Sequence, residues 1–198
     1  MLQQRKRELL PIAYFHLVFT IPPAIAEITL QNKRAVFQIL FRTSAETLLT
    51  IAADPKHLGA AVGFFSILHT WGQNVLFHPH LHCVVTGGGL SPDNQWIASR
   101  PDFFLSVGVL SRLFRRLFLE ALESAYAKGE LEFHGQLQLL GDPPSVPTST
   151  WLQYVKPNGS FMPNHPLAAP NRSSNTSDAT RTASPSAISA CWLSKISR

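Results

Sequence analysis

The chain has 198 residues, and its hydrophobic fraction of 45% is sufficient for one domain with a substantial core. Its formal charge of +5 suits an anionic partner such as nucleic acid, but many basic proteins with a similar excess bind none. The two cysteines, Cys83 and Cys191, form no CxxC pair, so neither a zinc ribbon nor a disulfide framework is expected. The basic N-terminus lacks a signal-peptide core, and no run approaches the ~18 apolar residues of a membrane span. We therefore predict a globular, cytoplasmic protein with no membrane partner.

The first predicted strand covers Tyr14–Ile21, which is rich in aromatic and β-branched residues and ends at two prolines. His16 within it has two interpretations. We favour a core histidine with satisfied hydrogen bonds, and the alternative is a histidine that faces the same site as the later histidine cluster. Apolar residues then recur at helical spacing over 31–52, which predicts a helix. A break near Thr43 and Ser44 is an alternative, because Ser44 could cap a second helix.

The next two elements are a turn and an apolar run. Asp54–Lys56 predicts the turn, and the run Ala60–His69 suits either a strand or a buried helix. We favour a strand that pairs antiparallel with the histidine-rich strand that follows it. Residues 70–74 would then form the loop between the two strands, at the end where the histidines lie.

The most informative stretch is Leu76–Gly89, where three of the chain's eight histidines fall within five residues. Apolar and β-branched residues from His80 onward predict a strand. Because side chains alternate between the two faces of a strand, His80 and His82 point the same way, and imidazoles about 7 Å apart can share one metal ion. His78 has the same parity, but Pro79 leaves its direction undetermined.

The alternative to a metal site is an ordinary pair of polar histidines on a strand. The clustering of the histidines and their apolar setting favour the metal site, because unpaired imidazoles there would be costly. The three glycines Gly87–Gly89 predict a flexible end to the strand, which backbone or substrate can approach closely.

The clearest predicted helix is Ser106–Lys128, which has a wide apolar stripe and is followed by Gly129. A turn at 92–94 and a short strand at Trp96-Ile97 precede it. The other side of the helix carries a basic cluster. For that cluster we favour a solvated face, with an arginine four residues before Glu120, over contacts to phosphate. The cluster consists of Arg112, Arg115 and Arg116.

The chain changes character after Lys156. Before that point, weak alternation over 131–140 predicts an edge strand, and Trp151–Lys156 predicts one more strand. After it, Pro, Ser, Thr, Asn and Ala dominate with almost no periodicity, and 172–180 has little with which to bury a core. We therefore predict a basic segment over 1–10, a folded domain over 11–156 and a disordered tail over 157–198.

Several stretches together resemble the rolling-circle insertion-sequence transposases of the two-tyrosine type, within the His-hydrophobic-His (HUH) endonuclease superfamily. The joined Trp-Gly-Gln and His-Pro-His-x-His blocks are the specific part of this resemblance, which covers roughly residues 8–156. It implies an α+β fold, in which an antiparallel sheet flanked by helices forms an HUH-endonuclease-like palm with the histidines on a central strand. The matching stretches are Leu10-Pro11, Tyr14–Thr20, Leu68–Gln73, His78–Val85, Gly87–Gly89, and Trp151 with Tyr154 and Lys156.

The resemblance also implies a metal-dependent reaction on DNA. His80 and His82 would be ligands of Mg²⁺ or Mn²⁺, and Gln73, His78 or His69 would supply a third ligand. The ion would act as a Lewis acid on a scissile phosphate of single-stranded DNA at transposon ends. A tyrosine would then attack the phosphorus and leave a 5′-phosphotyrosyl intermediate and a free 3′-hydroxyl. The candidates for DNA contacts are Trp71, Arg112, Arg115 and Arg116.

The chain departs from this family in two places. A cysteine-rich zinc-binding segment commonly precedes the Leu-Pro-x-x-Tyr-Phe-His stretch, and this sequence has none there. The paired tyrosines of the family belong in a helix after the Trp-x-x-Tyr-x-Lys strand, where this chain has a tail without tyrosine. The tyrosines it does have, Tyr14, Tyr126 and Tyr154, do not match the nucleophile position.

The sequence of the tail suggests that the gene still contains the family's DNA sequence here but is translated in a different reading frame. When assumed codons for Leu167–Ala187 are read one base earlier, permitted third-base choices give a stretch that contains Tyr-Leu-Gly-Arg-Tyr. Its two tyrosines fall four apart, on one face of a helix, as in the nucleophile motif of the family. We therefore expect a frameshifted, truncated gene whose frame breaks between Lys156 and Leu167.

The leading hypothesis is a transposase domain that binds a metal ion and single-stranded DNA but lacks its tyrosine nucleophile. The first alternative is an active enzyme, in which Tyr154 or a partner chain supplies the nucleophile. The second is a non-catalytic DNA-binding or inhibitory fragment that acts on a full-length transposase. The third is a plain metal-binding or misfolded remnant.

Overall fold

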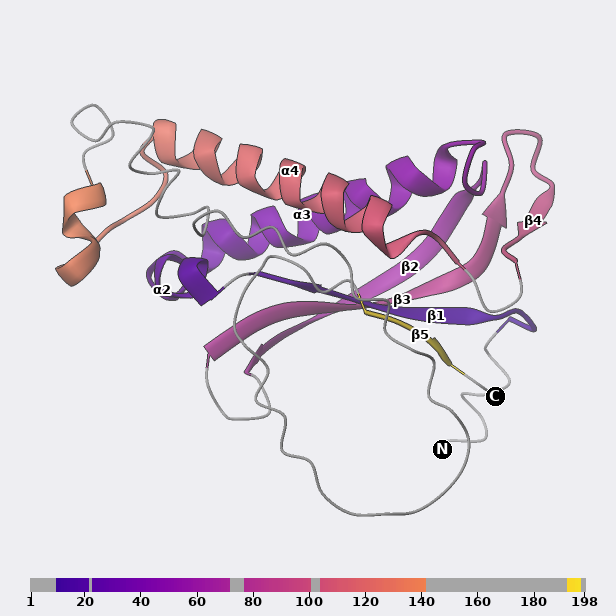
Figure 1. The fold of residues 1–198 in the computed structure, drawn as a ribbon, viewed down its shortest axis with the longest axis horizontal. Coiled ribbons are helices and arrows are strands. Elements are labelled where there is room, and N and C mark those ends of the chain that lie inside the picture. Colours follow the sequence, from indigo (N-terminus) through magenta and orange to yellow (C-terminus); the bar gives the residue numbers. More distant parts are fainter. Residues whose placement is uncertain (1–9, 22, 72–76, 101–103, 142–191, 197–198) are drawn as a thin grey trace, which may run out of the picture.

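The computed structural model describes residues 10–21, 23–71, 77–100, 104–141 and 192–196, which form two layers (Figure 1). One layer is a five-stranded sheet, and the other consists of helices that lie along one face of it. In chain order the elements are β1 (Tyr14–Thr20), α2 (Pro23–Gln31), α3 (Lys33–Ala53), β2 (Ala61–Trp71), β3 (Phe77–Leu90), β4 (Trp96–Ala98), α4 (Val107–Ala127), the 3-10 helix η1 (Gly135–Leu140) and β5 (Trp192–Ile196).

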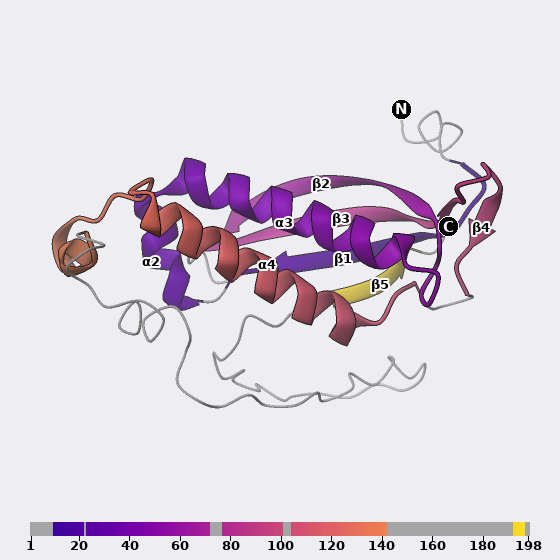
Figure 2. The same cartoon turned by 90° about the horizontal axis from the view of Figure 1, so that it is seen from above.

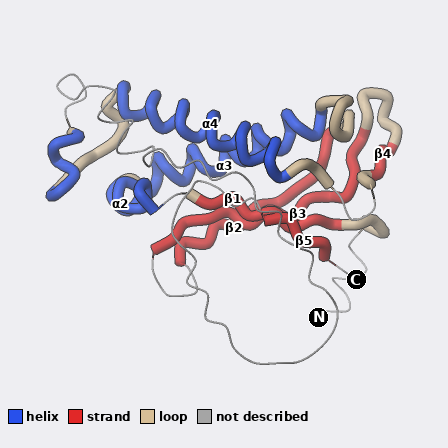
Figure 3. Tube along the Cα trace, viewed as in Figure 1, coloured by secondary structure: helices blue, strands red, loops and turns tan. Residues whose placement is uncertain are grey.

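The sheet is antiparallel throughout, with the strand order β2-β3-β1-β5 and with β4 paired to the far end of β3. The histidine-bearing strand β3 therefore lies between β2 and β1, as predicted. Within the described residues, α2, α3 and α4 all lie on one side of the sheet, as the views in Figures 2 and 3 show. The α+β class with an antiparallel sheet and flanking helices is confirmed. The other face of the sheet carries no described helix.

Strand alternation creates the core between the two layers. Leu81, Cys83 and Val85 of β3 are fully buried, whereas the residues between them are only partly buried. β1 shows the same alternation, with Phe15, Leu17 and Phe19 on its buried side, and α4 contributes an apolar stripe that includes Phe118. Because each such side chain contributes about 1.5–3 kcal/mol on burial, the core fixes which face of each strand is turned away from the helices.

The first helical region differs from the prediction in where it breaks. α3 runs through Thr43 and Ser44 without interruption, and both residues are buried. The Thr43 hydroxyl is satisfied within the helix, since it donates a hydrogen bond of 2.8 Å to the carbonyl oxygen of Ile39. The break falls at Asn32 instead, between α3 and the unpredicted helix α2. Pro23 begins α2, a position where proline costs nothing because its missing N–H would have no partner in the helix.

The predicted edge strand at 131–140 is wrong. Here the side chain of Asn32 binds the backbone of Glu132 twice: its Nδ2 donates to the carbonyl oxygen over 2.8 Å, and its Oδ1 accepts from the N–H over 2.7 Å. These bonds hold the segment against the helices rather than at the sheet edge. Residues 135–140 then form η1, which starts at Gly135 with φ of 60°.

Several other predictions are confirmed. The Asp54 turn, the antiparallel pairing of β2 with β3, the short strand β4 and the helix α4 with Gly129 beyond its end are all present. Thr70 and Trp71, which were predicted to begin a loop, belong to β2 instead. Residues 72–74 and the predicted strand Trp151–Lys156 lie outside the described residues.

The predicted disordered tail is corrected at one point. Trp192–Ile196 forms β5, which pairs antiparallel with β1 from Trp192↔Val18 to Ile196↔Tyr14. This short segment contains Trp, Leu and Ile, and it extends the sheet at the edge of β1 that β3 does not occupy. The rest of the predicted tail lies outside the described residues.

The glycine run is a close-packed part of β3 rather than a flexible end. Gly87 donates its N–H to the carbonyl oxygen of Ala13 over 2.7 Å, and Gly88 and Gly89 pair with β4. A Cβ atom at Gly87 would lie 2.8 Å from both the Cβ and the carbonyl oxygen of Ala13. The predicted close approach of backbone is therefore confirmed, and the predicted flexibility is wrong.

This packing predicts opposite effects for two Gly→Ala substitutions in neighbouring strands. Gly87→Ala should lower the free energy of unfolding by about 1–3 kcal/mol, because the new methyl group meets backbone that cannot move aside. Gly63→Ala is the matched control, since its Cβ would lie 3.6 Å from the Thr86 methyl group. It should leave stability unchanged or raise it by up to about 1 kcal/mol. Urea unfolding of both variants measures the difference, and equal effects would contradict the packing described here.

Candidate metal site

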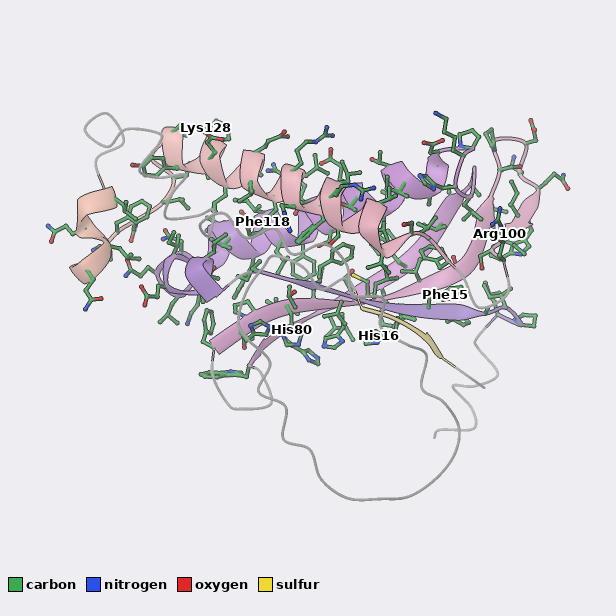
Figure 4. The ribbon with its side chains drawn as sticks, in the orientation of Figure 1. Phe15, His16, His80, Arg100, Phe118 and Lys128 are labelled. Carbon is green, nitrogen blue, oxygen red and sulfur yellow. The ribbon has the colours of Figure 1, made fainter. Side chains whose placement is uncertain are left out.

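The open face of the sheet, opposite the helices, carries histidines from three neighbouring strands. His16 comes from β1, His69 from β2, and His80 and His82 from β3. Figure 4 shows His16 and His80 projecting from this face, on the side away from Phe118. Directly paired residues in antiparallel strands share a face, and His69 is paired with His80. The register therefore places these imidazoles next to one another.

Three of these side chains form a compact triad, consisting of His69, His80 and His82. One ring nitrogen from each lies within 4.8 Å of the other two. The ring centroids are 4.2 Å apart for His69 and His82, 4.9 Å for His80 and His82, and 5.4 Å for His69 and His80. His80 and His82 are partly buried, and His69 is exposed. The triad could hold a single metal ion, since imidazole nitrogens are common metal ligands.

Hydrogen bonds at Nδ1 of His80 and of His82 are consistent with metal binding through Nε2. His80 Nδ1 lies 2.6 Å from the carbonyl oxygen of His78. A carbonyl oxygen only accepts, so His80 Nδ1 carries the proton, and the lone pair of Nε2 is left for a metal ion. His82 Nδ1 lies 2.6 Å from His16 Nε2, and the planes of the two rings differ by only 5°. The ring centroids are 4.9 Å apart, so the two rings lie edge to edge in one plane and meet through these nitrogens.

Electrostatics favour the neutral form of three of the neighbouring histidines, His16, His78 and His82. Burial, followed by the neighbouring imidazoles of His69, His80 and His16, lowers the pKa of His82 to about 4. Burial and His69 lower the pKa of His16, and burial and His80 lower the pKa of His78. A metal ion binds only the neutral imidazole. His82 is therefore in the form that binds a cation at neutral pH.

The two described candidates for the third metal ligand differ in where they lie relative to His80 and His82. His69 belongs to the triad, whereas His78 lies beside it, with its ring centroid 5.5 Å from that of His80 and its carbonyl oxygen bound to the His80 ring. Gln73 lies outside the described residues. The favoured interpretation of His16 as a core histidine is wrong, because it is only partly buried and contacts His82. Only the register between β1 and β3 reveals this contact, and sequence patterns do not give that register.

The candidates for DNA contacts fall on opposite sides of the sheet. Trp71 ends β2 two residues after His69, and 61% of its surface is exposed. Phe65 and Ile67 lie on the same exposed side of β2, with 55% and 51% exposure. The basic cluster instead lies on α4 in the helical layer, where Arg116 is 3.8 Å from Glu120. The described structure does not bring Arg112, Arg115 and Arg116 together with the histidines.

Comparison with known proteins identifies relatives of the chain. Residues 63–158 match a family described as "Putative transposase". The chain is 64% identical over 142 residues to "Putative transposase y4qJ" of Sinorhizobium fredii (strain NBRC 101917 / NGR234), a match that covers 71% of this chain and 36% of that protein. This chain is therefore similar to proteins that are described as transposases. It is also 41% identical over 81 residues to the "Transposase for insertion sequence element IS801" of Pseudomonas savastanoi pv. phaseolicola, covering 41% of this chain and 19% of that one.

The predicted resemblance to rolling-circle insertion-sequence transposases is confirmed, and the chain spans about a third of the length of the first of these transposases. Among solved structures, it is similar to the conjugative relaxase TrwC in complex with oriT DNA in a metal-bound structure. That similarity has a TM-score of 0.45 and 17% identity, over 72% of this chain and 62% of the relaxase. A TrwC complex with a 27-mer DNA gives a TM-score of 0.43 and 14% identity, over 70% of this chain and 63% of the relaxase.

None of the described helices is both long and apolar enough to span a membrane.

Proposed function

We propose that this chain is the part of a transposase that binds a divalent metal ion and single-stranded DNA. The observation that carries the proposal is the triad of His69, His80 and His82 on the open face of the sheet. Its ligands come from the central strand and its neighbour, so backbone pairing holds them in place before any ion binds.

The chemistry of the triad bears on which ion it would hold. Three imidazole nitrogens suit first-row transition ions better than Mg²⁺, which prefers oxygen ligands. Of the two ions expected from the sequence, Mn²⁺ is therefore the one that we propose. When bound, such an ion supplies Lewis acidity to a phosphate oxygen of DNA. Three protein ligands would leave coordination positions open for that oxygen and for water.

The surroundings of the triad suit a single strand of nucleic acid. Phe65, Ile67 and Trp71 project from the same edge strand as His69 and are more than half exposed. Aromatic side chains on an open sheet can stack with unpaired bases, each stack contributing about 1–3 kcal/mol. The formal charge of +5 favours an anionic partner in general. We therefore propose that DNA crosses this face, with its bases on β2 and a phosphate at the histidines.

The tyrosines of the described residues do not suit the role of nucleophile. Tyr14 is paired with Thr86, four residues and about 13 Å along β3 from His82. Tyr126 is buried in the helical layer, where its ring packs 5.8 Å from that of Phe133. We propose that the chain binds DNA without cleaving it through a tyrosine of its own. An active enzyme that uses Tyr154 is the alternative, and a covalent tyrosine–DNA adduct formed by the isolated chain would support it.

We also propose that a frameshift between Lys156 and Leu167 accounts for the tail without tyrosine. The family match ends at residue 158, near the start of this interval. The nucleotide sequence from the Trp151 codon onward tests the proposal. An open preceding frame that encodes Tyr-Leu-Gly-Arg-Tyr is expected, and a preceding frame interrupted by stop codons would exclude it.

Metal binding should depend on the triad and should strengthen DNA binding. His80→Ala and His82→Ala should each weaken Mn²⁺ binding by more than about tenfold in calorimetric titrations, because each removes a ligand. His57→Ala is the control, since His57 lies exposed in the turn after α3. In the parent chain, Mn²⁺ should increase the affinity for a mixed-sequence single-stranded oligonucleotide, and the two triad variants should lose this increase. A parent chain that binds no Mn²⁺, or triad variants that bind it as tightly, would exclude the proposal.

The stacking role predicts a difference between two exposed tryptophans. Trp71→Ala should weaken binding of the same oligonucleotide by about 1–3 kcal/mol, because a stacking surface beside the triad is lost. Trp96→Ala is the matched control: Trp96 is 44% exposed but lies on β4, which pairs with the end of β3 remote from the triad. Fluorescence anisotropy of a labelled oligonucleotide measures both affinities. Equal losses for the two variants would contradict DNA binding at the triad end of the sheet.

A further inference from the structure

His16 belongs to the histidine cluster without belonging to the triad. It lies on β1, where the register pairs it with Val84, a neighbour of the His82 position on the same face of β3. Its Nε2 is 2.6 Å from His82 Nδ1, and the two ring centroids are 4.9 Å apart in a common plane. The resemblance described above assigns no role to this side chain.

The short distance between the two nitrogens restricts where the protons lie. Two lone pairs, or two N–H groups, would repel each other at 2.6 Å, so one nitrogen donates and the other accepts. If His82 Nδ1 donates, then Nε2 of His82 keeps its lone pair and His16 accepts. If His16 donates, then His82 Nε2 carries the proton and cannot bind a metal ion.

The neighbouring ligand His80 shows the first of these arrangements. Its Nδ1 donates to the carbonyl oxygen of His78 over 2.6 Å, which leaves Nε2 free. His16 Nε2 would accept the Nδ1 proton of His82, just as the carbonyl oxygen of His78 accepts the Nδ1 proton of His80. The two ligands on β3 would then each have Nδ1 fixed by a partner on the sheet, and both would present Nε2.

We propose that His16 is a positioning residue of the metal site: its Nε2 accepts the Nδ1 proton of His82 and so holds His82 Nε2 ready for the ion. This inference rests on the proposed function of the triad. The acceptor on His16 lies in line with His82 Nδ1, in the common plane of the two rings, and so fixes the tautomer and the ring angle of His82. Loss of such a partner typically costs 10–100-fold in metal affinity.

Two substitutions at His16 test separately the contributions of its hydrogen-bond acceptor and of its aromatic ring. His16→Phe keeps a flat ring at this position but removes the acceptor, whereas His16→Gln loses the ring but can place an amide oxygen near the former Nε2 position. His57→Phe, in the exposed turn after α3, is the control for loss of an unrelated histidine. All variants are made in the full 198-residue chain, and their thermal unfolding is compared with that of the parent.

The first readout needs no metal ion. Long-range ¹H–¹⁵N NMR spectra of the metal-free chain report which nitrogen of each histidine is protonated, and a His82→Gln spectrum assigns the His82 signals. We expect the Nδ1–H tautomer for His82 in the parent, and a shift toward Nε2–H in His16→Phe. A parent chain with His82 already in the Nε2–H form would overturn the proposal.

The second readout is the affinity for Mn²⁺ alone, measured by calorimetry. His16→Phe should bind 10–100-fold more weakly than the parent, His16→Gln should recover most of the loss, and His57→Phe should match the parent. Equal affinity of parent and His16→Phe, or equally weak binding by the Phe and Gln variants, would overturn the proposal. So would the loss of one coordinated nitrogen in the electron spin-echo spectrum of Mn²⁺-bound His16→Phe, since His16 would then be a ligand. A parent that binds no Mn²⁺ would instead reject the proposed function itself.

Discussion

The structure depends on the register of β3 against its two neighbours. Pairing His69 with His80 on one side of β3, and His16 with Val84 on the other, brings imidazoles from three strands onto one small area of sheet. No loop needs to be ordered to bring these side chains together, because backbone hydrogen bonds already fix their spacing. A slip of one residue in either pairing would turn a strand's histidines toward the helices. The core prevents such a slip, since it would expose residues such as Leu17 and Leu81.

The two faces of the sheet therefore have different roles. The buried face supplies the apolar surface that packs against α3 and α4. The open face carries polar and aromatic side chains that do not belong to the core. The triad and the exposed side chains of Phe65, Ile67 and Trp71 share this second face. Partial burial and the neighbouring imidazoles lower the pKa of His82 to about 4, so His82 is neutral at neutral pH and can bind a cation. The proposed metal and DNA contacts both follow from this division.

Local patterns in the sequence predicted the elements but not the contacts between distant ones. Alternation and helical periodicity were sufficient for β1, β3 and α4, and parity alone placed His80 and His82 on one face. Local sequence favours a core position for His16, because its contact with His82 spans 66 positions and depends on the offset between two strands. Local alternation predicts a strand after α4, whereas the backbone of this segment binds the side chain of Asn32, which lies about 100 positions away. The short strand β5 was missed because its surrounding composition resembles a disordered tail, whereas its pairing depends on a free edge of β1.

The most direct test of the account is the location of a bound ion. Substoichiometric Mn²⁺ added to the ¹⁵N-labelled chain broadens the signals of ring nitrogens near the ion, so the histidine side-chain spectrum locates the site. The account predicts that His69, His80 and His82 broaden first, whereas His57 and His134, which lie exposed outside the sheet, keep their signals. Uniform broadening of all histidines, or selective broadening at His57 or His134, would contradict a metal site on the open face.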